Sequence, residues 1–352
     1  MNVMLLNDTA TIPHIGCLAV SDAHARMFGD AGHVVAERCF IGELRSFANR
    51  NEQAGIEAVL ADPELRSRID ACDAIVVNGE GTLHHGNGSE YFACLGAGQR
   101  LGKATLIVNA VFEAHAGWQA TLEQLDDFCV RDLESLRHAH SLGFSRARLV
   151  PDSFMGAQFG GQPNIALAGE ILVTDWHPAR DGDVGNALRT ILDSVDDSFF
   201  YPMLHGMHTR LWRGALADWS GASAILTARH HGVYLAACAR KPFVALASNT
   251  KKIEGLMQAA GADIPVCTNT DQVEAAFTRA ASDLGEYERL FDWLEDQTPL
   301  TTIRALGRAP GQSSAEAELA RLEQQLGQRP PGTSPRFWGL MNGSGRGLAP
   351  IG

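Results

Sequence analysis

SAILTARHHGVYLAACAR, residues 223–240, joins a short apolar run to an amphipathic stretch. Residues 223–227 are typical of the interior of a β-strand, and the apolar side chains from Val233 to Ala239 repeat at helical spacing. The pattern predicts a turn over Arg229 to Gly232, between a strand and a helix. In an open α/β sheet such a turn lies at the carboxyl end of a strand, where ligands bind.

The residues of this predicted turn are suited to binding an anion. Arg229 carries a planar guanidinium for phosphate or carboxylate, and the free amides of a helix N-terminus add affinity for anions. His230 and His231 follow directly, and Lys251 stands where the next helix is expected to begin. Because imidazole titrates near neutral pH, the stretch predicts an anionic ligand beside a group that moves protons.

Strands and helices alternate along the rest of the chain, which implies parallel sheets with helices on both faces. The expected strands are 3–6, 33–39, 74–78, 104–109, 127–131, 147–150, 170–174, 198–203, 224–227, 243–247 and 263–267. The expected helices are 18–29, 55–69, 91–102, 118–125, 132–142, 184–195, 209–219, 233–240, 251–260, 271–281, 285–295 and 314–326.

A Gly-rich segment at 156–163 (GAQFGGQP) interrupts this alternation and predicts a linker. We therefore expect two doubly wound, Rossmann-like domains that face each other across a cleft, at residues 1–160 and 164–305. A C-terminal helix and a Pro/Gly-rich tail would follow at 306–352. A single large sheet would leave the Gly-rich break unexplained.

Composition narrows the function. The 352 residues carry a net charge of −12, which argues against broad contact with nucleic acid. The seven cysteines are dispersed and lack a Cys-x-x-Cys spacing, so reduced thiols and a cytoplasmic location are expected. No signal peptide and no membrane-spanning run is predicted. The histidine pairs complete no zinc pattern, so no metal site is expected, and the 45% hydrophobic content is compatible with a homodimer.

Four segments carry a family resemblance. They are DAIVVNGEGTL at 73–83, VRDLES at 130–135, PDSF at 151–154, and RHH at 229–231 with the downstream Lys251. In this order they resemble the motifs of the polysaccharide pyruvyl transferase family, over roughly residues 73–260. Members of that family move the enolpyruvyl group of phosphoenolpyruvate onto two hydroxyls of a sugar, forming a cyclic ketal without a cofactor.

The resemblance implies roles for particular residues. His231 would be the general acid/base and Arg229 would assist it, while the donor would be held by Arg131, Arg229, His230 and Lys251. Alternatives remain open: Arg131 could pair with an acidic neighbour on a helix, Lys251 could be solvated, and Asp132 is expected to cap its helix. The second domain would then be the donor side and the first the acceptor side.

The acceptor side rests on two loops. Asn78, Gly79, Glu80, Gly81 and Thr82 follow a strand, where missing side chains let backbone approach a ligand. Glu80 could orient a sugar hydroxyl, act as a base or cap the next helix. The family's Asn-x-Gly-Asp near the first helix is matched by His14-Ile15-Gly16-Cys17, which keeps Gly16 and loses both the Asn and the Asp. Asn7 adds a polar group after the first strand.

The expected acceptor is a sugar of a cell-surface polysaccharide or of its precursor. Should that precursor be lipid-linked, Phe337 and Trp338 would provide peripheral contact at the inner face of the membrane. Two other functions suit the same GT-B-like architecture. One is a GT-B-type glycosyltransferase that uses a nucleotide sugar, and the other is a non-catalytic glycan-binding protein.

Overall fold

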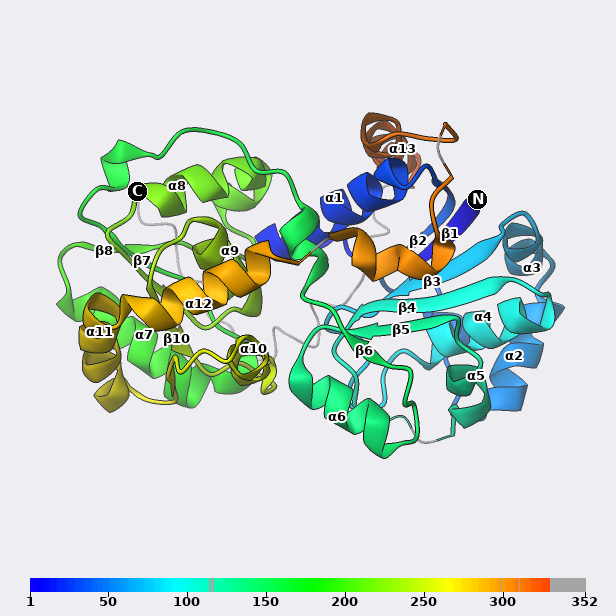
Figure 1. Cartoon of the computed structure of the whole chain (residues 1–352), viewed down its shortest axis with the longest axis horizontal. Coiled ribbons are helices and arrows are strands. Elements are labelled where there is room, and N and C mark those ends of the chain that lie inside the picture. Colours follow the sequence, from blue (N-terminus) through cyan, green and yellow to red (C-terminus); the bar gives the residue numbers. More distant parts are fainter. Residues whose placement is uncertain (114, 116, 298, 310, 330–352) are drawn as a thin grey trace.

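A computed structural model describes residues 1–329 apart from 114, 116, 298 and 310. Its strands form two separate sheets, in the orders β2-β1-β3-β4-β5-β6 and β11-β10-β9-β7-β8 (Figure 1). Every strand pair within these sheets is parallel. The expectation of two doubly wound α/β domains is confirmed.

The strands are β1 (Asn2–Asp8), β2 (Val34–Phe40), β3 (Ala74–Asn78), β4 (Ala104–Ala110), β5 (Asp127–Val130), β6 (Arg148–Leu149), β7 (Ile171–Val173), β8 (Ser198–Phe200), β9 (Ala224–Thr227), β10 (Phe243–Leu246) and β11 (Val266–Cys267). The α-helices are α1 (Ile15–Asp30), α2 (Glu52–Ala61), α3 (Pro63–Asp70), α4 (Ser89–Arg100), α5 (Gln119–Glu123), α6 (Leu133–Ser141), α7 (Asn186–Ser194), α8 (Ala215–Gly221), α9 (His230–Cys238), α10 (Lys252–Ala260), α11 (Val273–Ser282), α12 (Leu284–Glu295) and α13 (Ala315–Gly327). Shorter helical turns include η1 (Arg45–Phe47), η2 (Ser153–Gly156), η6 (Met207–Gly214) and η8 (Pro299–Leu306).

Both faces of each sheet are buried, as the continuous apolar strands require. Along β1, Met4 and Leu6 belong to one core, and Val3 and Leu5 belong to the core on the opposite face. Successive side chains of a strand point to opposite faces, so helices on both sides are needed to cover them. The second sheet likewise separates two buried clusters.

Helix α1 packs against both domains and so joins them (Figure 1). Its first half, including Ile15 and Ala19, packs in the core of the second domain, whereas Phe28 near its end packs on the first sheet. At the first residue of α1, Ile15 N donates to Met203 O at 2.8 Å. The amino end of α1 therefore lies where the domains meet.

The chain crosses back after α12. The turn η8 packs on β4 of the first sheet, and α13 packs on α1 and β2 near the amino terminus (Figure 1). The domain boundaries expected at 160, 164 and 305 stay a prediction. The tail with Phe337 and Trp338 lies outside the described residues.

Two expected elements differ in ways that have a local cause. The helix expected at 55–69 is two helices, because Pro63 cannot donate a backbone hydrogen bond and Asp62 accepts one from Leu65 N to cap α3. Helix α9 begins at His230 rather than after Gly232, so both histidines lie in its first turn. Asp132 caps α6, as expected, by accepting from Ser135 N at 2.8 Å.

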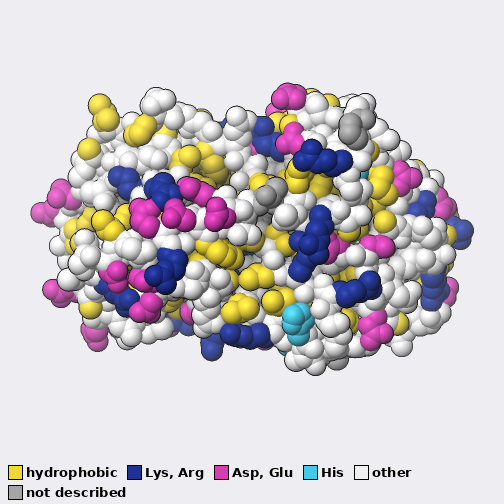
Figure 2. All heavy atoms as spheres, in the orientation of Figure 1, with side chains coloured by type: hydrophobic (Ala, Val, Ile, Leu, Met, Phe, Trp, Pro, Cys, Tyr) yellow, Lys and Arg dark blue, Asp and Glu magenta, His cyan; other side chains and the backbone are white. Residues whose placement is uncertain are grey.

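The surface shown in Figure 2 mixes acidic and basic side chains across both domains. Within residues 1–329, apart from the four positions not described, no helix is long and apolar enough to cross a membrane.

Candidate active site

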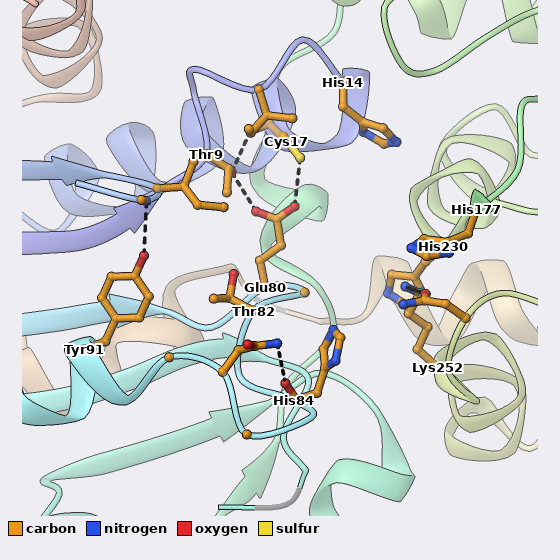
Figure 3. A pocket seen from close by; sticks show the side chains of 18 of the residues that line it. Thr9, His14, Cys17, Glu80, Thr82, His84, Tyr91, His177, His230 and Lys252 are labelled. Carbon is orange, nitrogen blue, oxygen red and sulfur yellow. Dashed lines mark hydrogen bonds between the residues drawn. The ribbon is translucent and has the colours of Figure 1, made fainter. Parts of the chain in front are cut away.

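A cavity of about 700 Å³ lies between the two domains, at the carboxyl ends of strands from both sheets. Figure 3 shows Thr9, Cys17, Glu80 and Tyr91 on the wall formed by the first domain. His177, His230 and Lys252 form the facing wall, which belongs to the second domain (Figure 3). This is the position at which open α/β sheets bind ligands.

Most residues assigned to the site from the sequence line this cavity. They are His14, Glu80, Gly81, Thr82, Arg131, Arg229, His230 and His231. Five others do not line it: Asn7, Gly16, Asn78, Gly79 and Lys251. The roles of all these residues in binding and catalysis stay predictions.

Asp152 contacts both Arg131 and His231 at the site. Its side chain is fully buried, and its Oδ2 lies 2.5 Å from Arg131 Nη1 and 3.2 Å from His231 Nε2. Burial alone would raise the pKa of this carboxyl, but the Arg131 guanidinium and His231 hold it well below its usual range. Asp152 is therefore ionised, and it fixes the positions of both partners.

His230 lies beside Asp152 and is kept neutral. Its Nε2 lies 3.5 Å from Asp152 Oδ2, and neither ring nitrogen has a hydrogen-bond partner among the described residues. Burial lowers the pKa of His230 to about 3, despite the opposing effect of Asp152. A buried neutral imidazole without a partner is able to donate to a ligand or accept from one.

Arg229 and Lys252 supply positive charge from the second domain. Arg229 is held by Asp175, with Nε 3.0 Å from Oδ2, and its Nη2 donates to Trp176 O at 2.8 Å. Lys252 Nζ donates to Asn249 Oδ1 at 2.9 Å. Burial, followed by repulsion from Arg131 and Arg229, lowers the pKa of Lys252 to about 7.

Lysine binding to the donor was expected at position 251, but the geometry favours its neighbour. Lys251 is exposed and stands at the N-cap of α10, whereas Lys252 begins the helix and lines the cavity. Lys252 is therefore the lysine of this pair that faces the cleft.

Two helices begin at this wall without a side-chain cap. The N-caps of α9 and α10 are Arg229 and Lys251, and neither side chain accepts a hydrogen bond from its helix. The first amides of a helix carry partial positive charge and have no partner within the helix. Both helix ends therefore add to the attraction that the cations exert on an anion.

Gly16 acts through close packing. A Cβ at this position would lie 2.0 Å from His231 Nδ1, so only glycine lets α1 approach the imidazole. Next to it, His14 Nδ1 accepts from Gly16 N at 2.9 Å and caps α1. Burial and then Arg229 lower the pKa of His14 well below its usual range, so this ring is neutral.

Asn7 and Asn78 support the loop after β3 from below. Asn7 Nδ2 donates to Asn78 O at 2.6 Å and to Thr82 Oγ1 at 2.9 Å, while its Oδ1 accepts from Tyr91 OH at 2.9 Å. Gly79 is needed for packing, because a Cβ there would lie 2.4 Å from Ala110 Cβ. These residues support the first-domain wall of the cavity but do not line it.

Glu80 is a buried carboxylate on the wall formed by the first domain. Thr9 Oγ1 donates to its Oε2 at 2.6 Å, and the Cys17 thiol donates to its Oε1 at 3.2 Å (Figure 3). His231 Nε2 lies 4.0 Å from Oε1. Burial, then Glu80, raises the pKa of Cys17 well above its usual range, so the thiol stays protonated and donates.

Sequence reasoning missed three residues of this site. Asp152 lies in the segment PDSF that carried the resemblance, and its position after the strand β6 was the signal that it lies next to the cleft. Lys252 differs from the expected lysine by one position, which a helix starting one residue later would have corrected. Asp175 follows β7 and had no distinguishing pattern.

A metal site is not evident in the part of the chain that the structure describes, where no group of three or more His, Cys, Asp or Glu side chains is arranged to hold an ion.

Two solved structures illustrate the similarity of the fold. A protein described as a UDP-N-acetylglucosamine 2-epimerase from Listeria monocytogenes has a TM-score of 0.51 at 12% identity, with 94% of this chain and 97% of that chain covered. MnaA of S. aureus in complex with UDP has a TM-score of 0.50 at 16% identity, with 93% and 97% covered. At such identities the likeness shows the fold alone, and that fold is GT-B-like.

Sequence comparison identifies the family. No curated protein matches the chain. The family model for polysaccharide pyruvyl transferases matches residues 14–250, which is more than half of the chain and contains most of the residues that line the cavity. The chain belongs to the polysaccharide pyruvyl transferase family.

Proposed function

We propose that this protein transfers the pyruvyl group of phosphoenolpyruvate to two hydroxyls of a saccharide and releases phosphate. Family membership supports the transfer of pyruvate. The observation that carries the choice of donor is the convergence of Arg131, Arg229 and Lys252 on one cavity, next to two uncapped helix N-termini. Such a site suits a small acid that carries both a carboxylate and a phosphate.

The reaction needs protons at defined places. Protonation of the methylene carbon of phosphoenolpyruvate creates an oxocarbenium-like centre at C2, which the first sugar hydroxyl attacks. Phosphate then leaves, and the second hydroxyl attacks the same carbon to close the ketal. The two hydroxyls lose two protons in all; one ends on the new methyl group and the other on phosphate.

His231 is the group proposed to protonate the methylene carbon. It stands at the domain boundary, fixed by Asp152 on one side and by Gly16 on the other. A side chain positioned in this way contributes about 10²- to 10⁴-fold to a proton transfer. Arg131 and Arg229 each keep N–H groups free of their aspartate partners to bind phosphate, since a guanidinium has five donors.

The acceptor is proposed to occupy the wall of the first domain. The cavity of about 700 Å³ is larger than phosphoenolpyruvate alone requires. Cavities for small ligands span ~300–1,000 Å³, so a sugar and the donor fit together. Tyr91 and Thr82 line this wall, on the far side of Glu80 from Lys252 (Figure 3).

The test is phosphate release from phosphoenolpyruvate. Purified protein is incubated with phosphoenolpyruvate and p-nitrophenyl hexopyranosides whose 4- and 6-hydroxyls are free, since this pair closes a six-membered ketal ring. Wild type should release phosphate only when a glycoside is present, and His231→Ala should release none. Absence of phosphate release with every glycoside, together with no thermal stabilisation by phosphoenolpyruvate, would refute the proposal.

A nucleotide-sugar donor and a purely glycan-binding role remain the competing functions. No contact in the described residues favours a nucleotide over phosphoenolpyruvate. The same thermal assay separates them: stabilisation by UDP-sugars without turnover of phosphoenolpyruvate would indicate the first, and stabilisation by glycans alone the second.

A further inference from the structure

We propose that Glu80 is the base that removes the proton from the attacking hydroxyl of the acceptor. The inference rests on the proposed function and adds a second catalytic residue to it. A second residue is needed because one histidine cannot give a proton to carbon and take one from a hydroxyl in the same step.

The position of Glu80 is unusual for a glutamate. Its exposed fraction is only 4%, yet it lines the cavity between the two domains. Its φ of +22° lies in the left-handed region, which is unfavourable for residues other than glycine. Backbone strain of this kind persists where the surrounding structure imposes it, and it clusters at active sites.

Helix capping does not explain this residue. The next helix, α4, begins at Ser89 and has Gly88 at its N-cap, so Glu80 lies well before it. The side chain instead accepts hydrogen bonds from Thr9, Cys17 and Asn78. These three donors come from the loop after β1, from the first turn of α1 and from the end of β3, and together they hold the carboxylate at one place.

The donors around Glu80 are neutral, which distinguishes it from the other buried carboxylate of the site. Asp152 is paired with Arg131, and its pKa is held well below the usual range, so it is a poor proton acceptor. Glu80 is not in an ion pair with any Arg or Lys that the structure describes; the partner found is His231, at 4.0 Å. Two carboxylates in different environments take different roles, as acid–base chemistry requires.

The proton balance closes with these two residues. In the first step His231 gives its proton to the methylene carbon while Glu80 takes the proton of the attacking hydroxyl, and the new C–O bond forms. In the second step the C–O bond to phosphate breaks, the second hydroxyl attacks, and neutral His231 takes its proton. Protonated Glu80 passes its proton to the departing phosphate. Both residues return to their starting states.

The sequence at position 17 agrees with this assignment. The motif of the resemblance has Asp there, whereas this chain has Cys17, whose Sγ lies 3.2 Å from Glu80 Oε1. The carboxylate that meets Cys17 in the cavity is supplied by the loop after β3.

The test uses three variants in the phosphate-release assay with phosphoenolpyruvate and a p-nitrophenyl hexopyranoside. Glu80→Gln keeps the shape and can accept the Thr9 hydrogen bond, and it should lower kcat ~10²- to 10³-fold while leaving KM for phosphoenolpyruvate within threefold. Thr9→Val, the control, loses the hydrogen bond but keeps the carboxylate, so kcat should fall less than ~10-fold. Glu80→Gly opens a space at a φ that suits glycine, and added formate should restore activity to this variant but not raise that of wild type.

Each result has one meaning. A wild type that neither binds nor turns over phosphoenolpyruvate would overturn the proposed function and the role of Glu80 with it. An active wild type with an equally active Glu80→Gln variant would overturn only the role of Glu80. Loss of activity in Glu80→Gln and Glu80→Gly without rescue by formate would likewise overturn the role of Glu80 as a base and make it a residue that only shapes the cavity wall.

Discussion

Replacing Gly16 with alanine should disable the site through a single methyl group. The added Cβ would lie 2.0 Å from His231 Nδ1 and 2.2 Å from its Cγ, whereas ordinary contacts begin at 3.4 Å. The ring must therefore move by about 1.4 Å, which breaks the 3.2 Å contact with Asp152, or α1 must shift away from it, which displaces Cys17 from the cavity wall. A misplacement of about 1 Å lowers activity ~100-fold. Overpacking of this kind costs ~1–3 kcal/mol of stability.

The assay is kcat/KM for phosphate release, normalised to folded protein, with thermal unfolding measured on the same sample. Gly214→Ala is the matched control, because a Cβ at that position meets nothing within 4 Å. The control should keep wild-type activity and stability. A Gly16→Ala variant with wild-type activity would refute the packing of α1 against His231.

Three further predictions concern charge. Lys252→Met should weaken the binding of phosphoenolpyruvate, measured by calorimetry, at least ~10-fold, because a charge-assisted contact is lost. Lys251→Met should change this affinity less than twofold. A larger loss of affinity in Lys251→Met than in Lys252→Met would contradict the placement of these lysines. Asp152→Asn leaves a buried guanidinium without its counter-charge and should cost ~3–5 kcal/mol in urea unfolding, against less than ~1 kcal/mol for Glu57→Gln in an exposed pair. The pKa of His230 falls to about 3 in the folded state, so as the pH is lowered the unfolded chain protonates this imidazole before the folded protein does, and the free energy of unfolding should drop as pH falls from about 6.5 toward 3. His230→Asn should reduce the slope of the free energy of unfolding against pH by up to ~1.4 kcal/mol per pH unit. An unchanged slope would show that the ring is not buried in its neutral form.

The fold was predictable because its signals are local. Strand β1 needs only the run around Val3 to Leu6, and its position in a parallel sheet follows from the helices on either side. Residues at strand ends were predictable for the same reason: Glu80, Arg131 and Arg229 each follow a strand, so all three face the same cleft.

What sequence reasoning could not supply is contact between distant segments. Nothing in the segment around Gly16 indicates that it touches His231, because that contact depends on α1 packing into the second domain. The partners of the buried charges were hidden for a similar reason, as Asp152 and Arg131 meet only after β5 and β6 pair. Lys252 was missed through the exact start of a helix, a boundary that sequence patterns place only within a residue or two.

The most direct test of pyruvyl transfer is to follow the C2 carbon of the donor. Phosphoenolpyruvate labelled with ¹³C at C2 is incubated with the protein and a p-nitrophenyl hexopyranoside, and the products are examined by NMR alongside phosphate release. We expect the label in a ketal carbon attached to two sugar oxygens, with one phosphate released per ketal and none from His231→Ala. Label that stays in phosphoenolpyruvate, while a UDP-sugar is consumed with the same acceptor, would contradict the account.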